Sequence, residues 1–202
     1  MRDDRSKTGL RQAADLTFRA GLRDGTVVTE RAVSQIEAHV GYVPGRGLTF
    51  ENVRHDVALL KLAAPIPTHV LDPFVLHKGS AQKGNVSAVS YGQGRSDALS
   101  RQRQCQVLDT RDDVLALDCD VTFGSSGAPV FSHQNGRGRI VSVISGGGTL
   151  GGKKVAFGMA LPRVVGDLKR QMRANAPQFG KPVRRVTVGA GTSSAGAKFI
   201  KP

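Results

Sequence analysis

Short apolar runs bounded by glycine, proline or polar residues recur along most of the chain. Runs of this kind, rich in Val, Leu, Ile and Ala, are typical of β-strands, and the 25 glycines supply the many turns between them. Three prolines between residues 65 and 76 predict an extended crossover instead of a strand. The segments that fit strands are, in chain order, 15–21, 31–42, 53–62, 85–91, 107–108, 114–115, 130–131, 140–144 and 154–161. The pattern therefore predicts an all-β protein.

Two tight turns are expected within this pattern. Asn135-Gly136, between two predicted strands, is typical of a β-hairpin. A second hairpin is expected to turn at residues 111–113, with Cys105 and Cys119 near the ends of its arms. The two cysteines could then face each other and form a disulfide, which would fit an oxidising, exported compartment; two buried free thiols are the alternative. Without CxxC spacing or a nearby His pair, they make a poor zinc ligand set, and no metal is expected.

The last fifth of the chain departs from the strand pattern. Residues 162–174 begin with proline and carry apolar side chains at helical spacing, which predicts a C-terminal helix. These apolar positions are Val164, Val165, Leu168 and Met172. Beyond Ala176 the chain is rich in Gly, Pro, Ser and Thr with a few basic residues, a composition that cannot bury a core. We therefore expect residues 176–202 to form a disordered tail.

Charge and length limit the classes of function. The formal net charge is +13, and nine basic residues but one acidic residue follow Pro162. A basic tail can bind nucleic acid or anionic lipid weakly and non-specifically, although a solvated terminus has the same composition. No RNA-binding aromatic signature is present, so no specific nucleic-acid partner is expected. No run reaches the length of a membrane span, and the charged N-terminus lacks a signal-peptide core. The 202 residues suffice for one ordinary domain or two small barrels.

The strongest chemical signal is the stretch Gly-Ser-Ser-Gly-Ala-Pro at residues 124–129, which leads into an apolar run. A serine hydroxyl is a poor nucleophile unless a special turn presents it, and glycines on both sides permit such a turn. The backbone N–H groups of Gly124 and Ser126 could then point at a developing oxyanion. A plain Gly/Ser turn between two strands is the alternative.

A second signal is Asp56, which precedes the apolar run Val-Ala-Leu-Leu-Lys-Leu. The run predicts a buried strand, and charged residues rarely go inside unpaired. The carboxylate is therefore expected to be held for a partner, the alternative being a cap at a strand edge.

Together these two motifs resemble those of the trypsin-like (chymotrypsin-fold) serine peptidases, over about residues 15–175. The resemblance implies Ser126 as nucleophile and Asp56 as the acid that orients the base. It also implies two antiparallel six-stranded β-barrels, the first incomplete here, followed by a C-terminal helix. No cofactor or metal is implied, the substrate is a peptide or protein, and a monomer is expected. Ser125 and Ala128 are similar to those of bacterial members.

The histidine of this family is not found where the resemblance places it. No Ala-Ala-His-Cys segment occurs, and only His39 and His55 precede Asp56. His55 adjoins Asp56, and neighbours on a strand point to opposite faces; His39 resembles a structural position. We therefore expect that Met1 falls just after a missing histidine segment, and that the chain as given is nearly inactive on peptides.

The resemblance also implies a substrate site. Ser145, Gly146 and Gly147 are expected to form the edge that pairs with the substrate backbone, or else a plain glycine loop. Asp120, six residues before Ser126, corresponds to the floor of the primary pocket, where a carboxylate favours Arg or Lys. Lys153 and Lys154 are expected on the opposite wall and could neutralise that charge.

Three functions remain open from the sequence. The first is a serine endopeptidase, secreted or periplasmic by resemblance. The second is an inactive pseudopeptidase that keeps the peptide groove, and the third a tail-driven binder of nucleic acid or membrane surfaces. The expected domains are residues 1–76 for the remaining first barrel, 77–175 for the second barrel with its helix, and 176–202 for the tail.

Overall fold

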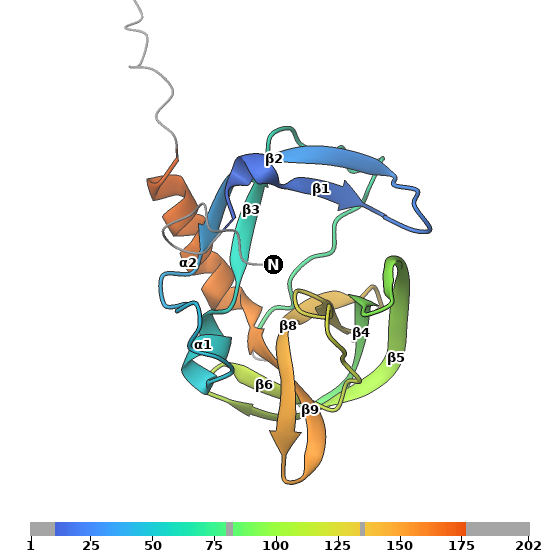
Figure 1. The fold of residues 1–202 in the computed structure, drawn as a ribbon, viewed down its shortest axis with the longest axis vertical. Helices are drawn as coiled ribbons and strands as arrows, with labels where there is room; N and C mark the ends of the chain where they lie inside the picture. Colours follow the sequence, from blue (N-terminus) through green and yellow to red (C-terminus); the bar gives the residue numbers. More distant parts are fainter. Residues whose placement is uncertain (1–10, 80–82, 134–135, 177–202) are drawn as a thin grey trace, which may run out of the picture.

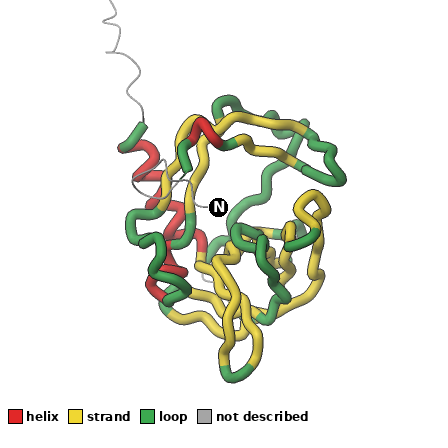
Figure 2. Tube along the Cα trace, in the orientation of Figure 1, coloured by secondary structure: helices red, strands yellow, loops and turns green. Residues whose placement is uncertain are grey.

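A three-stranded sheet and a closed barrel lie side by side in the computed structural model, which describes residues 11–79, 83–133 and 136–176 (Figure 1). The expected tail, from residue 177 on, and the segment at Met1 lie outside these residues. Residues 63–79 run as loop from the sheet to the barrel (Figure 2), as the three prolines predicted. The observed architecture is thus mainly β, as expected.

The first sheet has the order β1-β2-β3, with both neighbouring pairs antiparallel. A short 3₁₀ turn, η1 (Ala13–Asp15), leads into it. The strands are β1 (Thr17–Ala20), β2 (Thr29–Ala38) and β3 (Ala58–Leu62). Among the described residues this sheet does not close, so only part of the expected first barrel is observed.

Helix α1 (Phe50–His55) replaces the beginning of a predicted strand. The apolar pattern predicted extended chain over 53–62, and that expectation is wrong before Ala58. Thr49 caps the helix by accepting a hydrogen bond from the Asn52 N–H at 3.2 Å, which stabilises the first turn. The prediction of burial is also wrong, because every residue of β3 is at least partly exposed.

The closed barrel has the strand order β4-β5-β6-β9-β8-β7. Its strands are β4 (Gly84–Gly92), β5 (Arg95–Arg111), β6 (Val114–Leu117), β7 (Pro129–Ser132), β8 (Arg139–Leu150) and β9 (Lys153–Ala160). Asp112 and Asp113 both have positive φ, which a two-residue hairpin turn requires, so the predicted turn is confirmed. β7 and β8 pair as the Asn135-Gly136 signal predicted, although Asn135 itself lies outside the described residues.

The barrel interior is the main core. Leu115, Leu117, Val130 and Ala156 are almost fully buried there and pack with the disulfide of Cys105 and Cys119. A second cluster forms where the barrel meets the C-terminal helix and includes Met159, Leu161 and Val164. Apolar burial of this kind is the main stabilising term of the fold.

Helix α2 (Leu161–Ala174) confirms the predicted C-terminal helix and joins the barrel to the first sheet (Figure 1). The first N–H groups of a helix have no acceptor within it, and a proline near the start of α2 fits there because it has no N–H. The side chains of Val164 and Leu168 are buried. Its last turn reaches Glu37 of β2, a carboxylate that is 6% exposed. Three amide side chains donate to this carboxylate: Gln35 at 2.8 Å, Gln171 at 2.8 Å and Asn175 at 3.0 Å.

Candidate active site

A tight loop between β6 and β7 presents Ser126. The Ser125 N–H donates to Thr122 O at 3.0 Å, and the Ala128 N–H donates to Ser125 O at 3.0 Å. Gly124 and Gly127 both have φ of +86°, a region that favours glycine. Ser125 is 1% exposed, whereas Ser126 is exposed. The loop therefore buries one serine and turns the next toward solvent.

The same loop leaves two backbone donors unused. Among the described residues, the N–H groups of Gly124 and Ser126 donate to no protein acceptor. Gln93, which directly follows β4, fixes the loop by donating its N–H to Phe123 O at 2.8 Å. Fixed, unpaired N–H groups next to a hydroxyl can stabilise an oxyanion that forms there.

Asp56 lies just beyond helix α1, and Ser145 of β8 connects it to the serine loop. The Ser145 hydroxyl donates to Asp56 Oδ2 at 2.6 Å, while the Ser126 hydroxyl donates to the Ser145 carbonyl at 3.0 Å. Burial, and then the nearby Asp56 carboxylate, raises the pKa of Tyr42. The structure thus brings Asp56 and Ser126, which are distant in the sequence, to the same residue: Asp56 bonds to the hydroxyl of Ser145 and Ser126 to its carbonyl.

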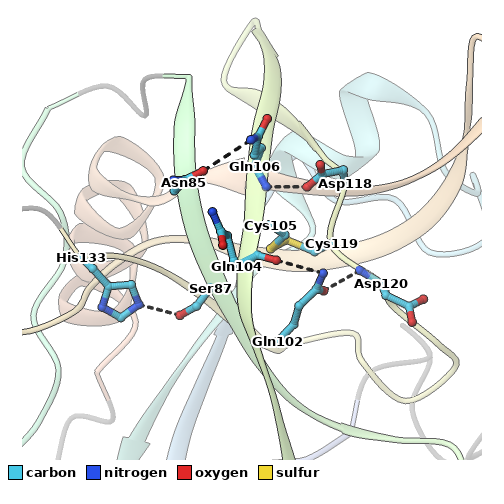
Figure 3. Close-up of a disulfide and its surroundings, with 10 residues drawn as sticks. All are labelled: Asn85, Ser87, Gln102, Gln104, Cys105, Gln106, Asp118, Cys119, Asp120 and His133. Atoms are coloured by element: carbon cyan, nitrogen blue, oxygen red, sulfur yellow. Dashed lines mark hydrogen bonds between the residues drawn. A yellow bond between two sulfur atoms is a disulfide. The ribbon is translucent and has the colours of Figure 1, made fainter.

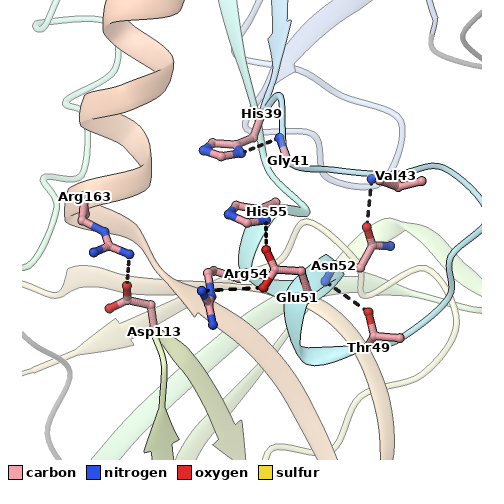
Figure 4. A network of polar contacts seen from close by, with 10 residues as sticks. All are labelled: His39, Gly41, Val43, Thr49, Glu51, Asn52, Arg54, His55, Asp113 and Arg163. Atoms are coloured by element: carbon pink, nitrogen blue, oxygen red, sulfur yellow. Dashed lines mark hydrogen bonds and ion pairs between the residues drawn. The ribbon is translucent and has the colours of Figure 1, made fainter.

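No histidine ring of the described residues, which include all five histidines of the sequence, is hydrogen-bonded to Asp56 or Ser126. His39 and His55 stack on each other with ring centroids 4.4 Å apart. His39 accepts from the Gly41 N–H at 3.1 Å, and the ring of His133 bonds to Ser87 at 2.7 Å (Figures 3 and 4). Neither ring of the pair that precedes Asp56 is therefore bonded to Asp56 or Ser126 in this structure.

A cleft of about 770 Å³ opens beside Ser126. Gly146 and Gly147 line one side, and Asp120 and Lys154 bring charges of both signs to it. Asp120 forms no ion pair within the described part of the chain, and its N–H donates to Gln102 Oε1 at 2.7 Å (Figure 3). Lys153, expected on the same wall, is not among the lining residues.

Cys105 and Cys119 form a disulfide across β5 and the chain that leaves β6 (Figure 3). This confirms the predicted pairing and removes the alternative of two free thiols. Cys119 lines the cleft and directly precedes Asp120. The bridge therefore anchors the wall from which the Asp120 side chain projects.

Sequence reasoning missed Leu48 as a residue of this site. Leu48 lines the cleft although it belongs to the loop before α1, far from the barrel in sequence. Its signal in the sequence is weak: a single leucine between Gly47 and Thr49. Sequence reasoning also ended the strand at Ile144 and left a glycine loop possible beyond it, whereas β8 continues through its glycines to Leu150.

Two classes of feature are not found in the described ranges. No three or more His, Cys, Asp or Glu side chains in residues 11–79, 83–133 and 136–176 are grouped so that they could hold a metal ion. Over the same residues, neither helix has the length and apolar character needed to cross a membrane.

Comparison with protein families identifies the family of the chain. A family model described as the trypsin-like peptidase domain matches residues 8–141, more than half of the chain. The match includes Asp56 and Ser126 and ends inside β8, shortly before Ser145. No curated protein matches the chain.

Proposed function

The chain belongs to the trypsin-like peptidase family, and on that premise we propose that it is a serine endopeptidase domain that acts through an acyl-enzyme at Ser126. The observation that supports this most is the hydrogen-bonded line from Ser126 through Ser145 to Asp56. The motif of Ser126 and the motif of Asp56 were identified in the sequence independently, and both residues bond to Ser145. The unpaired N–H groups of Gly124 and Ser126 add support.

In the proposed reaction, Ser126 Oγ attacks the carbonyl carbon of the peptide bond and loses its proton to a base. The N–H groups of Gly124 and Ser126 stabilise the negative charge that forms on the carbonyl oxygen. The C–N bond then breaks as the base protonates the leaving amine, and water later hydrolyses the serine ester. Asp56 would orient an imidazole base and stabilise its charged form.

None of the five histidines of the chain is hydrogen-bonded to Asp56 or to Ser126. The hydroxyl of Ser126 instead donates to a carbonyl oxygen, which cannot remove its proton. Loss of one triad member typically costs several orders of magnitude in rate, leaving weak catalysis from binding and the oxyanion site. We therefore expect the chain by itself to react slowly with peptides.

Asp120 is the residue we propose to contact the substrate side chain next to the cut bond. Its carboxylate has no ion-pair partner among the described residues, and a guanidinium in a sheltered cleft would pair with it well. Lys154 borders the same cleft and opposes this preference. Asp120→Asn should therefore reduce binding of peptides ending in Arg while leaving those ending in Phe unchanged, and equal binding losses would argue against the assignment.

The decisive experiment supplies the missing base from solution. The chain is incubated with a fluorophosphonate probe, with and without free imidazole, and labelled residues are mapped by mass spectrometry. We expect slow labelling of Ser126 that imidazole accelerates in proportion to its neutral form. Ser126→Ala should abolish the labelling, and Asp56→Asn should reduce the acceleration more than the unassisted rate.

Two results would contradict the proposal. One is labelling spread evenly over exposed serines, because it would show that Ser126 has no special reactivity. The other is acceleration that is the same in the Asp56→Asn variant, because imidazole would then act without the carboxylate.

One observation favours a second candidate, an inactive module that binds peptides in the same groove. It is the absence of a histidine ring bonded to Asp56 or Ser126 among the described residues. Under this alternative, peptides bind but imidazole does not accelerate labelling. The third possibility, binding through a basic tail, concerns residues that lie outside the described ranges, and a weak anionic partner there stays a prediction.

Family membership and the disulfide are consistent with an extracellular location. We extend the proposal to a secreted or periplasmic, monomeric protein that acts on peptide or protein substrates. Size-exclusion chromatography of the oxidised chain would test the monomer.

A further inference from the structure

A second, smaller pocket lies behind one wall of the cleft beside Ser126. It has a volume of about 280 Å³ and is lined by β5 on one side and by the chain after Cys119 on the other. Asp120, Val121 and Ile144 line both cavities, whereas Ser126 and the glycines of β8 line only the cleft. The two cavities are therefore separate and share a wall.

The floor of this pocket is apolar. It is formed by Ala88, Val121, Ala128 and Ile144. Ala88, Ala128 and Ile144 are at most 7% exposed and belong to the barrel core, against which Val121 packs. Covering an apolar surface of this kind with a hydrocarbon group removes it from water, which is favourable. The floor therefore favours a ligand with an apolar part.

Side chains of β4 and β5 form a polar rim. Ser90 and Ser100 are directly opposed in the register of these strands, and opposed residues direct their side chains to the same face. The Ser90 hydroxyl accepts from the Ser125 hydroxyl at 3.5 Å, so its own proton is free to donate. The Ser100 hydroxyl has no partner within the described ranges. The rim therefore offers two hydroxyl donors to a bound acceptor.

Arg95 brings a positive charge to the same rim. It is the register partner of Gly92, and a Cβ atom built on Gly92 would lie 2.7 Å from Arg95 Nη2 and 3.0 Å from Arg95 Nε. The guanidinium therefore occupies the space that this glycine leaves free. Arg95 forms no hydrogen bond or ion pair among the described residues, yet it is only partly exposed and lines the pocket. A guanidinium in this position can bind a carboxylate through two parallel hydrogen bonds.

The remaining charges leave the pocket positive. Asp120 is its one acidic lining residue within the described part of the chain. The Asp120 N–H donates to Gln102 Oε1, and the carboxylate points away from Gln102 (Figure 3). Arg101 also lines the pocket and has no ion-pair partner in the same ranges. Two arginines and one aspartate thus line the pocket, so it favours an anion over a cation.

We propose that this pocket binds a small organic acid, a monocarboxylate with an apolar tail. The carboxylate pairs with Arg95 and accepts from the hydroxyls of Ser90 and Ser100, while the tail covers the apolar floor. Ligand pockets usually have volumes of roughly 300–1,000 Å³, so a pocket of about 280 Å³ suits a small acid and not a peptide segment. The proposal does not depend on the peptidase function, because neither Ser126 nor Asp56 lines the pocket.

The test is an NMR titration of the full chain with sodium benzoate as the probe, at constant ionic strength. Benzyl alcohol carries the same ring without the charge, and acetate carries the charge without the ring. We expect benzoate to bind with a Kd of about 1 mM, typical of a ligand with few non-hydrogen atoms, and to shift the amide signals of Ser90, Ser100 and Gln102. Benzyl alcohol and acetate should each bind about fivefold more weakly, because each lacks one of the two contributions.

Substitutions at Arg95 show where the ligand binds. Arg95→Gln should weaken benzoate binding about tenfold by removing a charge-assisted pair, and Arg95→Lys should restore part of it, because it keeps the charge but not the planar fork. Arg103, on the same strand, is exposed, has no ion-pair partner among the described residues and does not line the pocket, so Arg103→Gln controls for net charge. Lys154→Gln tests the cleft as the alternative place, since Lys154 lines only the cleft.

The place of the shifts and their dependence on Arg95 decide the result. Saturable shifts at Ser100 and Gln102 that weaken in Arg95→Gln but not in Arg103→Gln support the proposal. It is overturned by the absence of saturable shifts, by shifts confined to the glycines of the cleft, or by an equal loss of binding in Lys154→Gln. Equal binding of benzyl alcohol also overturns it, because the charge would then play no part. The dispersion of the amide signals shows whether each variant is folded.

Discussion

Substituting Glu37 should measure how strongly helix α2 is fastened to the first sheet. Glu37 is an acidic side chain, 6% exposed, with no cationic partner among the described residues. Its carboxylate accepts from Gln35, Gln171 and Asn175. Glu37→Gln keeps the size of the side chain but replaces one acceptor oxygen by an NH₂ group. This group cannot accept the hydrogen bonds that the neighbouring amide side chains donate.

The structure sets the size of the effect. A hydrogen bond to a charged group contributes about 1.5–3 kcal/mol, and a buried donor that loses its partner costs a similar amount. Gln35 and Gln171 retain second bonds, to Met172 O and Ala38 O, so their losses are partial. We therefore expect Glu37→Gln to lower the free energy of unfolding by about 3 kcal/mol, equivalent to about 6–12 °C in Tm for a domain of this size.

The pH dependence gives an independent check. Burial raises the pKa of the Glu37 carboxyl, but hydrogen bonds from Gln171, Gln35 and Asn175 outweigh it and hold the pKa below the ordinary 4.5. The folded state thus binds this proton less readily than the unfolded state does. The stabilisation is complete above pH 4.5 and is lost as the pH falls through the lowered pKa.

The assay is urea denaturation of wild type and Glu37→Gln at neutral pH and at several pH values below 4.5. The difference in free energy should be largest at neutral pH and narrow in acid. Glu30, on the same strand, is an exposed partner of Arg19, and Glu30→Gln should change stability by less than about 1 kcal/mol. A constant difference at all pH values, or an equal effect of Glu30→Gln, would refute the reasoning.

Three further predictions concern the disulfide, the stacked histidines and the bridging serine. Replacing Cys105 and Cys119 together by serine should lower the free energy of unfolding by about 3 kcal/mol, because the bridge joins residues 14 apart; an unchanged urea midpoint would contradict this. His55→Phe keeps a ring against His39 but removes its charge, so the pKa of His39, lowered mainly by burial and then by His55, should rise toward 6.5 in an NMR titration. Ser145→Ala removes a hydroxyl donor from the Asp56 carboxylate and should slow imidazole-assisted labelling about tenfold, while equal slowing without imidazole would argue for a purely structural role.

The strand pattern located β4, β6 and β9 because their signals are local, but it predicted only residues 107–108 of β5 (Arg95–Arg111). Buried strands such as β6 and turn residues such as Asp112-Asp113 depend on neighbours in the sequence. The pattern failed at residues 53–57, where extended chain was expected but Thr49 caps helix α1 (Phe50–His55). Side-chain capping there outweighed the weak strand preference of the following residues. The extension of β8 through its glycines was also uncertain, since glycine has low strand propensity.

The motifs identified Asp56 and Ser126, but they could not show how these residues relate in space. That relation passes through Ser145, whose hydroxyl and carbonyl serve one partner each. Leu48 reaches the cleft only because the loop before α1 folds onto a different part of the molecule. Glu37 likewise receives donors from the other end of the described chain. Such contacts depend on tertiary packing, which no local pattern contains.

The hydrogen bonds of Ser126 and Asp56 explain how the site can keep its geometry without a base. Asp56 accepts a hydrogen bond from the Ser145 hydroxyl, and the Ser126 hydroxyl donates a hydrogen bond to the Ser145 carbonyl, so both have a protein partner. An imidazole that enters between them needs to displace only the Ser126 bond, because a carboxylate can accept several hydrogen bonds at once. It would then accept from Ser126 and donate to Asp56, so that one bond is exchanged for two. The cost of entry is therefore mainly the entropy of holding a free imidazole, and this is the contribution that covalent attachment to a polypeptide would remove.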